Sequence, residues 1–148
     1  MDTMKNIKIL FVQKISDGQF ETEGIWCKVE NENYIIDNIP FISKRIALGD
    51  IIKAEYDESD NSYYFEDFVS VSGNSTIHMY VRNERLIPEV RASLKEMGCE
   101  SEVFLSRKLI AVNVPKEINY NPIKKYLDNG ELGGNWNYGE ACLAHSYE

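Results

Sequence analysis

The stretch YYFEDFVSVSGNSTIHMYVR, residues 63–82, decides the fold, because two strand patterns meet in it at a turn over residues 72–75. Before this turn, short β-rich segments follow one another with turn residues between them and no helix pattern. After it, strand patterns alternate with two helix patterns. The sequence therefore predicts an α+β protein, with an all-β half over residues 1–75 packed directly on a mixed half over residues 76–148 as one compact unit.

The first half contains five short strand patterns separated by Gly, Asn, Asp or Ser turns. They are Lys5–Gln13, Glu23–Glu30, Tyr34–Ile36, Ile51–Tyr56 and Tyr63–Ser72. Pro40 lacks a backbone donor, so the segment around it is expected to leave the sheet. Short strands at this close spacing are typical of a small β-barrel.

The second half contains two helix patterns among four strand patterns. One helix is predicted from Pro88 to Met97 with Gly98 ending it, and another from an N-cap at Asn121. The strands are Thr76–Arg82, Glu102–Ser106, Leu109–Val114 and Asn135–Leu143. The order β-α-β-β-α-β predicts a ferredoxin-like half.

Alternation along the first strand of this half assigns its side chains to two sheet faces. Ile77, Met79 and Val81 are expected beneath both helices, and His78 and Tyr80 on the opposite face. That opposite face is too apolar to remain exposed to water. We expect the first half to cover it, with a partner chain in a dimer as the alternative.

The chain is acidic, with a formal net charge of −8 and a pI of about 4.8. Residues 1–75 hold 14 Asp and Glu against 7 Lys and Arg, whereas residues 76–148 hold 10 against 9. The negative electrostatic field of residues 1–75 either serves solubility or attracts a basic partner. It repels phosphate backbones, so we expect no nucleic-acid partner, and we disfavour an RNA-recognition role for the open sheet face.

Cys27, Cys99 and Cys142 lie far apart and form no C-x-x-C pair. We therefore expect free thiols, no metal site and no cofactor. The apolar run Ile7–Val12 is too short for a signal peptide or a membrane span. The protein is accordingly expected to be cytoplasmic, with no membrane partner.

Acidic residues and tyrosines gather around the polar loop Asp57–Ser62. Aromatic side chains anchor protein interfaces and acidic ones steer a basic partner, so this hairpin is a candidate docking surface; a merely soluble loop is the alternative. It is not a calcium loop, because the glycine and the closing Glu of that motif are missing. The predicted partner-binding residues are Glu55, Asp57, Glu58, Asp60, Tyr63, Tyr64, Glu66 and Asp67.

His78 could act as a general base on a substrate, or could simply pack between the two halves. The turn at Gly73 is no phosphate loop, because neither a Lys nor a helix follows it. We assign no catalytic residue, and we expect His145, near the C-terminus, to be exposed. A ligand pocket between the two halves would be lined by Trp26, His78, Tyr80 and Trp136.

Six segments of the chain carry a resemblance to a known family. They are Lys8–Val12, Glu23–Cys27, Asp37–Phe41, Gly49–Ile52, Ser72–Ile77 and Gly134–Tyr138. On these segments the chain resembles a bacterial family of domains of unknown function, DUF4265. The resemblance implies the α+β architecture and no reaction, and relatives found beside toxin genes imply an immunity role by association.

Three functions remain as hypotheses. The first is an immunity protein that neutralises a cognate toxin, such as a basic nuclease, by stoichiometric binding through the acidic hairpin. The second is a small-molecule-binding or regulatory module with its pocket between the halves. The third, ranked last, is an enzyme with His78 as base. The sequence leaves the partner and the oligomeric state open.

Overall fold

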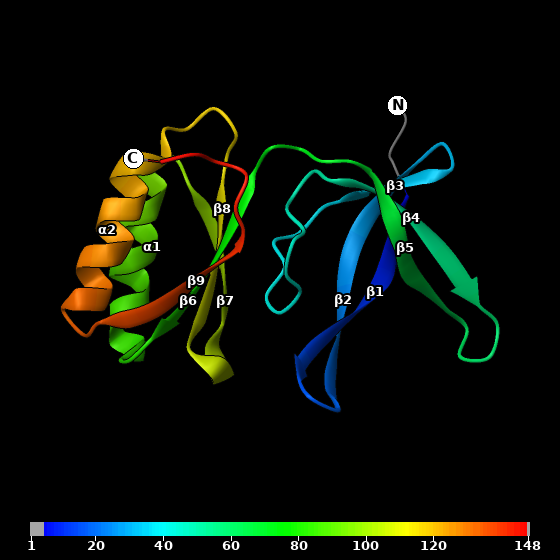
Figure 1. The fold of residues 1–148 in the computed structure, drawn as a ribbon, viewed down its shortest axis with the longest axis horizontal. Helices are drawn as coiled ribbons and strands as arrows, with labels where there is room; N and C mark the ends of the chain where they lie inside the picture. Colours follow the sequence, from blue (N-terminus) through cyan, green and yellow to red (C-terminus); the bar gives the residue numbers. More distant parts are fainter. Residues whose placement is uncertain (1–4, 148) are drawn as a thin grey trace.

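The computed structural model of the protein describes residues 5–147 and contains two β-sheets joined by one chain crossing (Figure 1). The first sheet is a closed barrel whose strands follow one another in chain order. Its strands are β1 (Asn6–Ser16), β2 (Gln19–Glu30), β3 (Asn33–Ile36), β4 (Ile51–Asp57) and β5 (Ser62–Ser70).

The barrel closes through a parallel pair, because each strand reverses the direction of the one before it and the number of strands is odd. Ile9 and Leu10 of β1 lie opposite Tyr63 and Tyr64 of β5, while every other neighbouring pair is antiparallel. Apolar side chains of alternating positions fill the interior. The barrel core consists of Ile9, Phe11, Ile25, Cys27, Ile36, Ile46 and Ile52.

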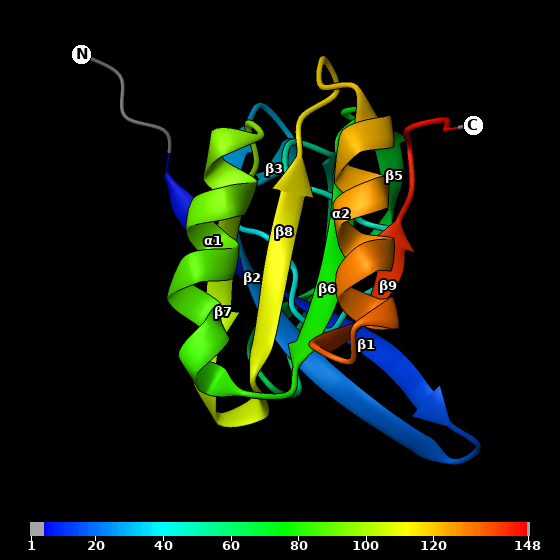
Figure 2. The same ribbon diagram turned by 90° about the vertical axis from the view of Figure 1, so that its left-hand side faces the viewer.

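The second sheet has four strands in the order β7-β8-β6-β9, with both helices on one of its faces (Figure 2). Short 3-10 turns at Glu84–Leu86 and Leu105–Arg107 precede α1 and β8. Its elements are β6 (Ser75–Val81), α1 (Ile87–Glu96), β7 (Glu100–Phe104), β8 (Leu109–Val114), α2 (Tyr120–Leu132) and β9 (Trp136–Cys142).

Helix boundaries follow from capping residues. Asn119, rather than Asn121, is the N-cap of α2, and its side chain accepts a hydrogen bond from the backbone N–H of Asn121. The predicted N-cap was therefore wrong by two residues. Gly98 follows α1 with φ of 90°, a left-handed conformation that ends a helix and that glycine adopts without a steric cost.

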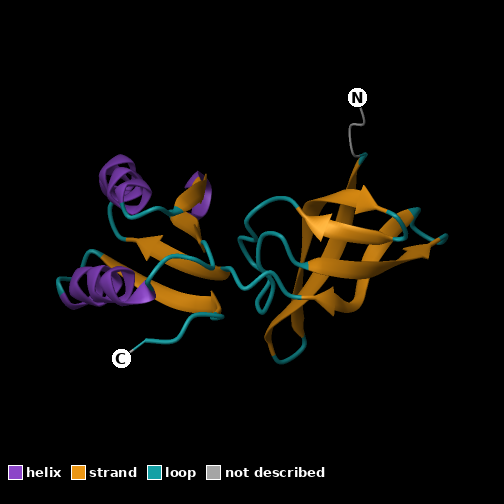
Figure 3. Cartoon of the chain, turned by 90° about the horizontal axis from the view of Figure 1, so that it is seen from above, coloured by secondary structure: helices purple, strands orange, loops and turns teal. Residues whose placement is uncertain are grey.

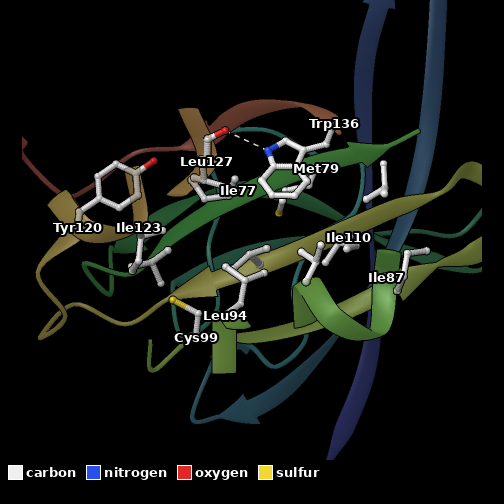
Figure 4. Close-up of a cluster of buried hydrophobic side chains, with 14 residues drawn as sticks. Ile77, Met79, Ile87, Leu94, Cys99, Ile110, Tyr120, Ile123, Leu127 and Trp136 are labelled. Atoms are coloured by element: carbon white, nitrogen blue, oxygen red, sulfur yellow. Dashed lines mark hydrogen bonds between the residues drawn. The ribbon is translucent and has the colours of Figure 1, made fainter. Parts of the chain in front are cut away.

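The helices and their sheet face enclose the larger core (Figure 4). Ile77, Met79 and Val81 are buried there, which confirms the predicted orientation of β6. Trp136 lies over the same core, and its indole Nε1 donates to the carbonyl of Leu127 at 3.0 Å. The α+β class is thus confirmed at the level of a closed five-stranded barrel and a second sheet with two helices.

The opposite face of the second sheet looks toward the barrel, and residues 37–50, the loop between β3 and β4, lie between them (Figures 1 and 3). This loop contains no helix or strand, yet Ile39, Ser43, Ile46 and Ala47 in it are buried. We call it the wedge loop. The first half covers most of the open face, as expected, chiefly through this loop, and it leaves Tyr80 49 % exposed.

The wedge loop is bonded to the second sheet through backbone groups. The hydroxyl of Thr76 donates to the Ile46 carbonyl at 2.9 Å, and the Arg45 N–H donates to the carbonyl of Ala141 at 2.8 Å. Phe41 also packs edge-on against Phe104 of β7, with ring centroids 5.6 Å apart. A segment without secondary structure thereby satisfies its buried backbone groups, as burial requires.

The barrel holds the other side of the wedge loop through one buried carboxylate. Glu23 of β2 is only 8 % exposed, and it accepts hydrogen bonds from three successive backbone N–H groups. The donors are Phe41, Ile42 and Ser43, at 2.7, 3.0 and 2.8 Å. A carboxylate that accepts several amide hydrogen bonds makes the strong, charge-assisted kind. Glu23 therefore fixes the backbone that seals the sheet.

Replacing Glu23 by Ala should lower the free energy of unfolding by about 2–4 kcal/mol, because it leaves three partly buried N–H groups without their acceptor. Urea unfolding followed by circular dichroism measures the change. Glu21→Ala on the same strand is the matched control, since Glu21 forms a partly exposed ion pair with Arg107. The control should cost no more than about 1 kcal/mol; equal losses for the two variants would contradict the role assigned to Glu23.

Replacing Gly130 by Ala in α2 should destabilise the protein, although this change usually stabilises a helix. A Cβ at this position would lie 1.8 Å from Cζ2 of the buried Trp136 ring. Overpacking of this kind costs about 1–3 kcal/mol. The control is Gly139→Ala, whose Cβ would meet no atom within 4 Å. Thermal unfolding should show a lower Tm for Gly130→Ala alone, and an unchanged or raised Tm would refute the contact.

Candidate functional site

The β4–β5 hairpin projects from the side of the barrel that faces away from the helices (Figure 1). Its outer surface has a hollow of about 360 Å³. The hollow is lined by Glu55, Tyr56, Asp57, Glu58 and Tyr64. None of the carboxylates in this hollow forms an ion pair with any residue in the described range 5–147.

Hydrogen bonds within the hairpin order its tip. The Asp57 carboxylate accepts from the backbone N–H and the hydroxyl of Ser59 at 2.9 and 2.6 Å, and these bonds lower the pKa of Asp57. The hydroxyl of Tyr64 donates to the Asp60 carboxylate, which raises the pKa of Tyr64. The Asp57 carboxylate is thus charged at neutral pH and hydrogen-bonded within the turn.

The structure brings together most of the predicted partner-binding residues, but not all of them. Glu55, Asp57 and Glu58 share the hollow with Tyr64, and Asp60 binds the Tyr64 hydroxyl. Tyr63 instead points inward, against the barrel core and the Tyr56 ring. Glu66 and Asp67 are exposed farther along β5, outside the hollow. Tyr56 is one of the three tyrosines that flank the acidic loop in the sequence and was left out of the predicted contact set, yet it is 43 % exposed beside the acids.

A second hollow, of about 340 Å³, lies on the barrel-facing side of the second sheet. Residues from β6, β9 and the wedge loop line it: His78, Tyr80, Lys44, Asn137 and the chain from Tyr138 to Ala141. The sequence predicted two of these, His78 and Tyr80. Lys44 and the β9 residues could not be assigned without knowing which loop faces which strand.

The two tryptophans that were predicted to line the pocket, Trp26 and Trp136, do not line this hollow. This part of the pocket prediction was therefore wrong. Trp136 pairs with Val81 in the β6–β9 ladder and packs under the helices, on the opposite face of the sheet from His78. Trp26 is 50 % exposed on the outside of the barrel, where the Lys8 ammonium lies 5.3 Å from its ring centroid. Neither residue lines the hollow beside His78.

His78 is 4 % exposed, and its Nε2 lies 2.7 Å from the carbonyl oxygen of Pro40. A carbonyl only accepts, so Nε2 carries the hydrogen. Burial lowers the pKa of His78, which keeps the imidazole neutral at physiological pH. Its Nδ1 is then an acceptor, and no residue within 5–147 donates to it. This geometry matches the packed histidine foreseen as an alternative to a general base.

His145 is half-buried, so the expectation that it is exposed was wrong. Its Nδ1 lies 2.6 Å from the hydroxyl oxygen of Ser75, and its Nε2 lies 2.8 Å from the Pro115 carbonyl. The Ser75 oxygen also accepts the N–H groups of Ala144 and His145, so its hydrogen-bonding capacity is filled. Because Ser75 is fully buried, this pair fastens the C-terminal segment and is no exposed nucleophile.

The cysteines are free, as the sequence predicted. Burial raises the pKa of Cys27 to about 12 and that of Cys99 to about 11, so both remain thiols at neutral pH. Within residues 5–147, no three His, Cys, Asp or Glu side chains are grouped so that they could hold a metal ion. No helix in the described chain is long and apolar enough to cross a membrane.

Comparison with solved structures and with known sequences adds the fold and the family. A crystal structure of a hypothetical protein from Neisseria gonorrhoeae superposes with a TM-score of 0.81 at 23% sequence identity, covering 98% of this chain and 100% of that one. This likeness shows a shared fold. No curated protein matches the sequence. The family profile described as a domain of unknown function (DUF4265) matches residues 23–138. The resemblance seen in the sequence is thereby confirmed, and the chain belongs to the DUF4265 family.

Proposed function

We propose that the protein is a binding protein that neutralises a basic partner, and specifically an immunity protein for a cognate bacterial toxin. One observation carries this proposal: a hollow on a projecting hairpin, lined by two tyrosines and by three carboxylates that form no ion pair with any of residues 5–147. Unpaired acids beside exposed aromatic rings are what a cationic protein surface would recognise. The proposal requires no reaction by this chain.

The proposed mechanism is stoichiometric occlusion. Glu55, Asp57 and Glu58 would take the positions of substrate phosphates in the cationic cleft of a toxin such as a nuclease. Tyr56, which is 43 % exposed, and Tyr64 would supply apolar contact area between the acids. The internal hydrogen bonds of the tip reduce the conformational entropy lost on binding.

The charge distribution supports this assignment. The net charge of −8 resides almost entirely in residues 1–75, which include the hairpin, so the field would steer a cationic partner toward the barrel. The same field disfavours nucleic acid as a partner. We also propose a cytoplasmic location, because the cysteines are unpaired and the sequence contains no long apolar run.

We also propose a ferredoxin-like classification for the second sheet and its helices, with residues 1–75 and 76–148 as the two halves. The strand order β7-β8-β6-β9 supports it, because the two edge strands follow the helices and the two central strands precede them. The wedge loop belongs to the first half but packs on the second, so the halves would not separate cleanly.

The test uses the product of an adjacent gene that inhibits growth when it is expressed alone. Co-expression of this protein should restore growth, and the purified pair should bind with an association rate that falls steeply as salt is added. The variant with Glu55→Gln, Asp57→Asn and Glu58→Gln should bind at least about tenfold more weakly.

The matched control is the pair Glu30→Gln and Glu32→Gln on the β2–β3 hairpin, which removes exposed acids from another turn of the same barrel. Binding lost only in the β4–β5 variant would identify the docking surface. Full protection by that variant would refute the hairpin as the site. The immunity role is refuted if no adjacent gene encodes a product that both harms cells and binds this protein.

A further inference from the structure

The hollow beside His78 is formed by elements other than the β4–β5 hairpin, and different chemical groups line it. It lies where β6 and β9 face the wedge loop. Its volume of about 340 Å³ falls at the lower end of small-molecule pockets, which span roughly 300–1,000 Å³. The hollow is therefore suited to a small ligand, and not to a macromolecule.

The strand register creates this hollow. His78 lies between Ala111 of β8 on one side and Gly139 of β9 on the other, and cross-strand neighbours share a sheet face. These are the two smallest residue types, so no neighbouring side chain covers the imidazole from within the sheet. A Cβ at Gly139 would meet nothing within 4 Å, which shows that the space beside His78 is open.

The imidazole offers the hollow one hydrogen-bond acceptor. The Pro40 carbonyl holds Nε2 in its protonated form, so the opposite nitrogen, Nδ1, has a lone pair and receives no donor from residues 5–147. The His78 residue is 96 % buried, but Nδ1 itself is not sealed, because the fully buried side-chain atoms without a partner in residues 5–147 are Ser43 Oγ and Asn113 Oδ1. Nδ1 therefore opens onto the hollow, where the hydrogen-bond donor of a ligand can replace water.

Lys44 of the wedge loop offers the same hollow a cation. Only its backbone N–H is bonded, to the side-chain oxygen of Gln13, and its ammonium has no carboxylate partner within the described residues. Tyr80 and Asn137, a cross-strand pair of β6 and β9, also line the hollow. Glu140 also belongs to the lining, but its carboxylate is bonded to Lys124 and to the Tyr120 hydroxyl. A single ammonium fits one carboxylate better than a phosphate, which commonly recruits an Arg fork or a helix N-terminus.

We propose that the hollow between β6, β9 and the wedge loop binds a small organic acid that carries a hydroxyl or amino group beside its carboxylate. The hydroxyl or amino group donates to His78 Nδ1, and the carboxylate accepts from the Lys44 ammonium. Tyr80 and Asn137 line the hollow beside the body of the ligand. This site acts independently of the acidic hairpin, so either proposal can fail without the other.

The test titrates the protein, labelled with ¹⁵N in its histidine rings, with hydroxy acids from glycolate to phenyllactate and amino acids from glycine to tyrosine. A bound acid should move the Nδ1 resonance of His78 and leave the His145 resonances in place. The same acids without the hydroxyl or amino group, such as propionate and phenylpropionate, and the neutral amides should bind at least about tenfold more weakly.

Three variants locate the site. Lys44→Met removes the cation, and Gly139→Leu fills the hollow without backbone strain. His78→Phe removes the acceptor at Nδ1 together with the donor to the Pro40 carbonyl. Each should raise the Kd at least about tenfold while far-UV circular dichroism stays native. Lys125→Met on α2, across the sheet from the hollow, is the control and should bind as the unaltered protein does.

Two results would overturn the proposal. One is that no acid of either series moves the His78 resonance at millimolar concentration, which would mean that the hollow holds water alone. The other is that a bound acid retains its Kd in Gly139→Leu, which would place it elsewhere on the protein. Equal binding of the acids that lack the donor group would overturn the role assigned to His78 Nδ1.

Discussion

The carboxylate of Glu23 and the three amides that donate to it fix the wedge loop, through which the barrel contacts the second sheet. Without these bonds, the N–H groups of Phe41, Ile42 and Ser43 would lie against the barrel with no acceptor, because the wedge loop forms no ladder of its own. Once that backbone is fixed, Pro40 reaches His78 and Phe41 reaches Phe104. One buried charge thus turns an irregular loop into the cover of an apolar sheet face.

This arrangement separates two surfaces with opposite chemistry. The β4–β5 hairpin lies on the free side of the barrel, and its acids have no ion-pair partner within residues 5–147. The hollow beside His78 lies at the junction, where Lys44 presents a cation that the same wedge loop positions. A change in the loop would therefore alter the hollow beside His78 and the contact between the sheets together, while leaving the hairpin unaffected. The barrel thus carries the proposed docking hairpin on one side, and its wedge loop contributes Lys44 to the hollow on the other.

Alternation and turn residues were enough to predict the strands, both helices and the face of β6 that packs beneath the helices, since these depend on neighbours in the sequence. Features that depend on how the strands pair could not be predicted from the sequence. The sequence around Trp136 alternates regularly, but only its pairing with Val81 decides that the ring packs under the helices. Glu23 looks like any acid on a strand until residues 41–43 fold over it, and Ser75 meets His145 across 70 positions. The acidic hairpin was predictable because its members are adjacent in the chain, whereas Lys44 and Gly139 join His78 only through the tertiary fold.

Hydrogen exchange at the amides of Phe41, Ile42 and Ser43, resolved by NMR, tests most directly whether Glu23 fixes the wedge loop. If it does, these amides exchange only when the protein unfolds globally, with protection within about tenfold of the central strand β8, although they lie in a segment without secondary structure. Exchange at the rate of an open loop, with β8 still protected, would show that the loop opens on its own and that the carboxylate does not fix it.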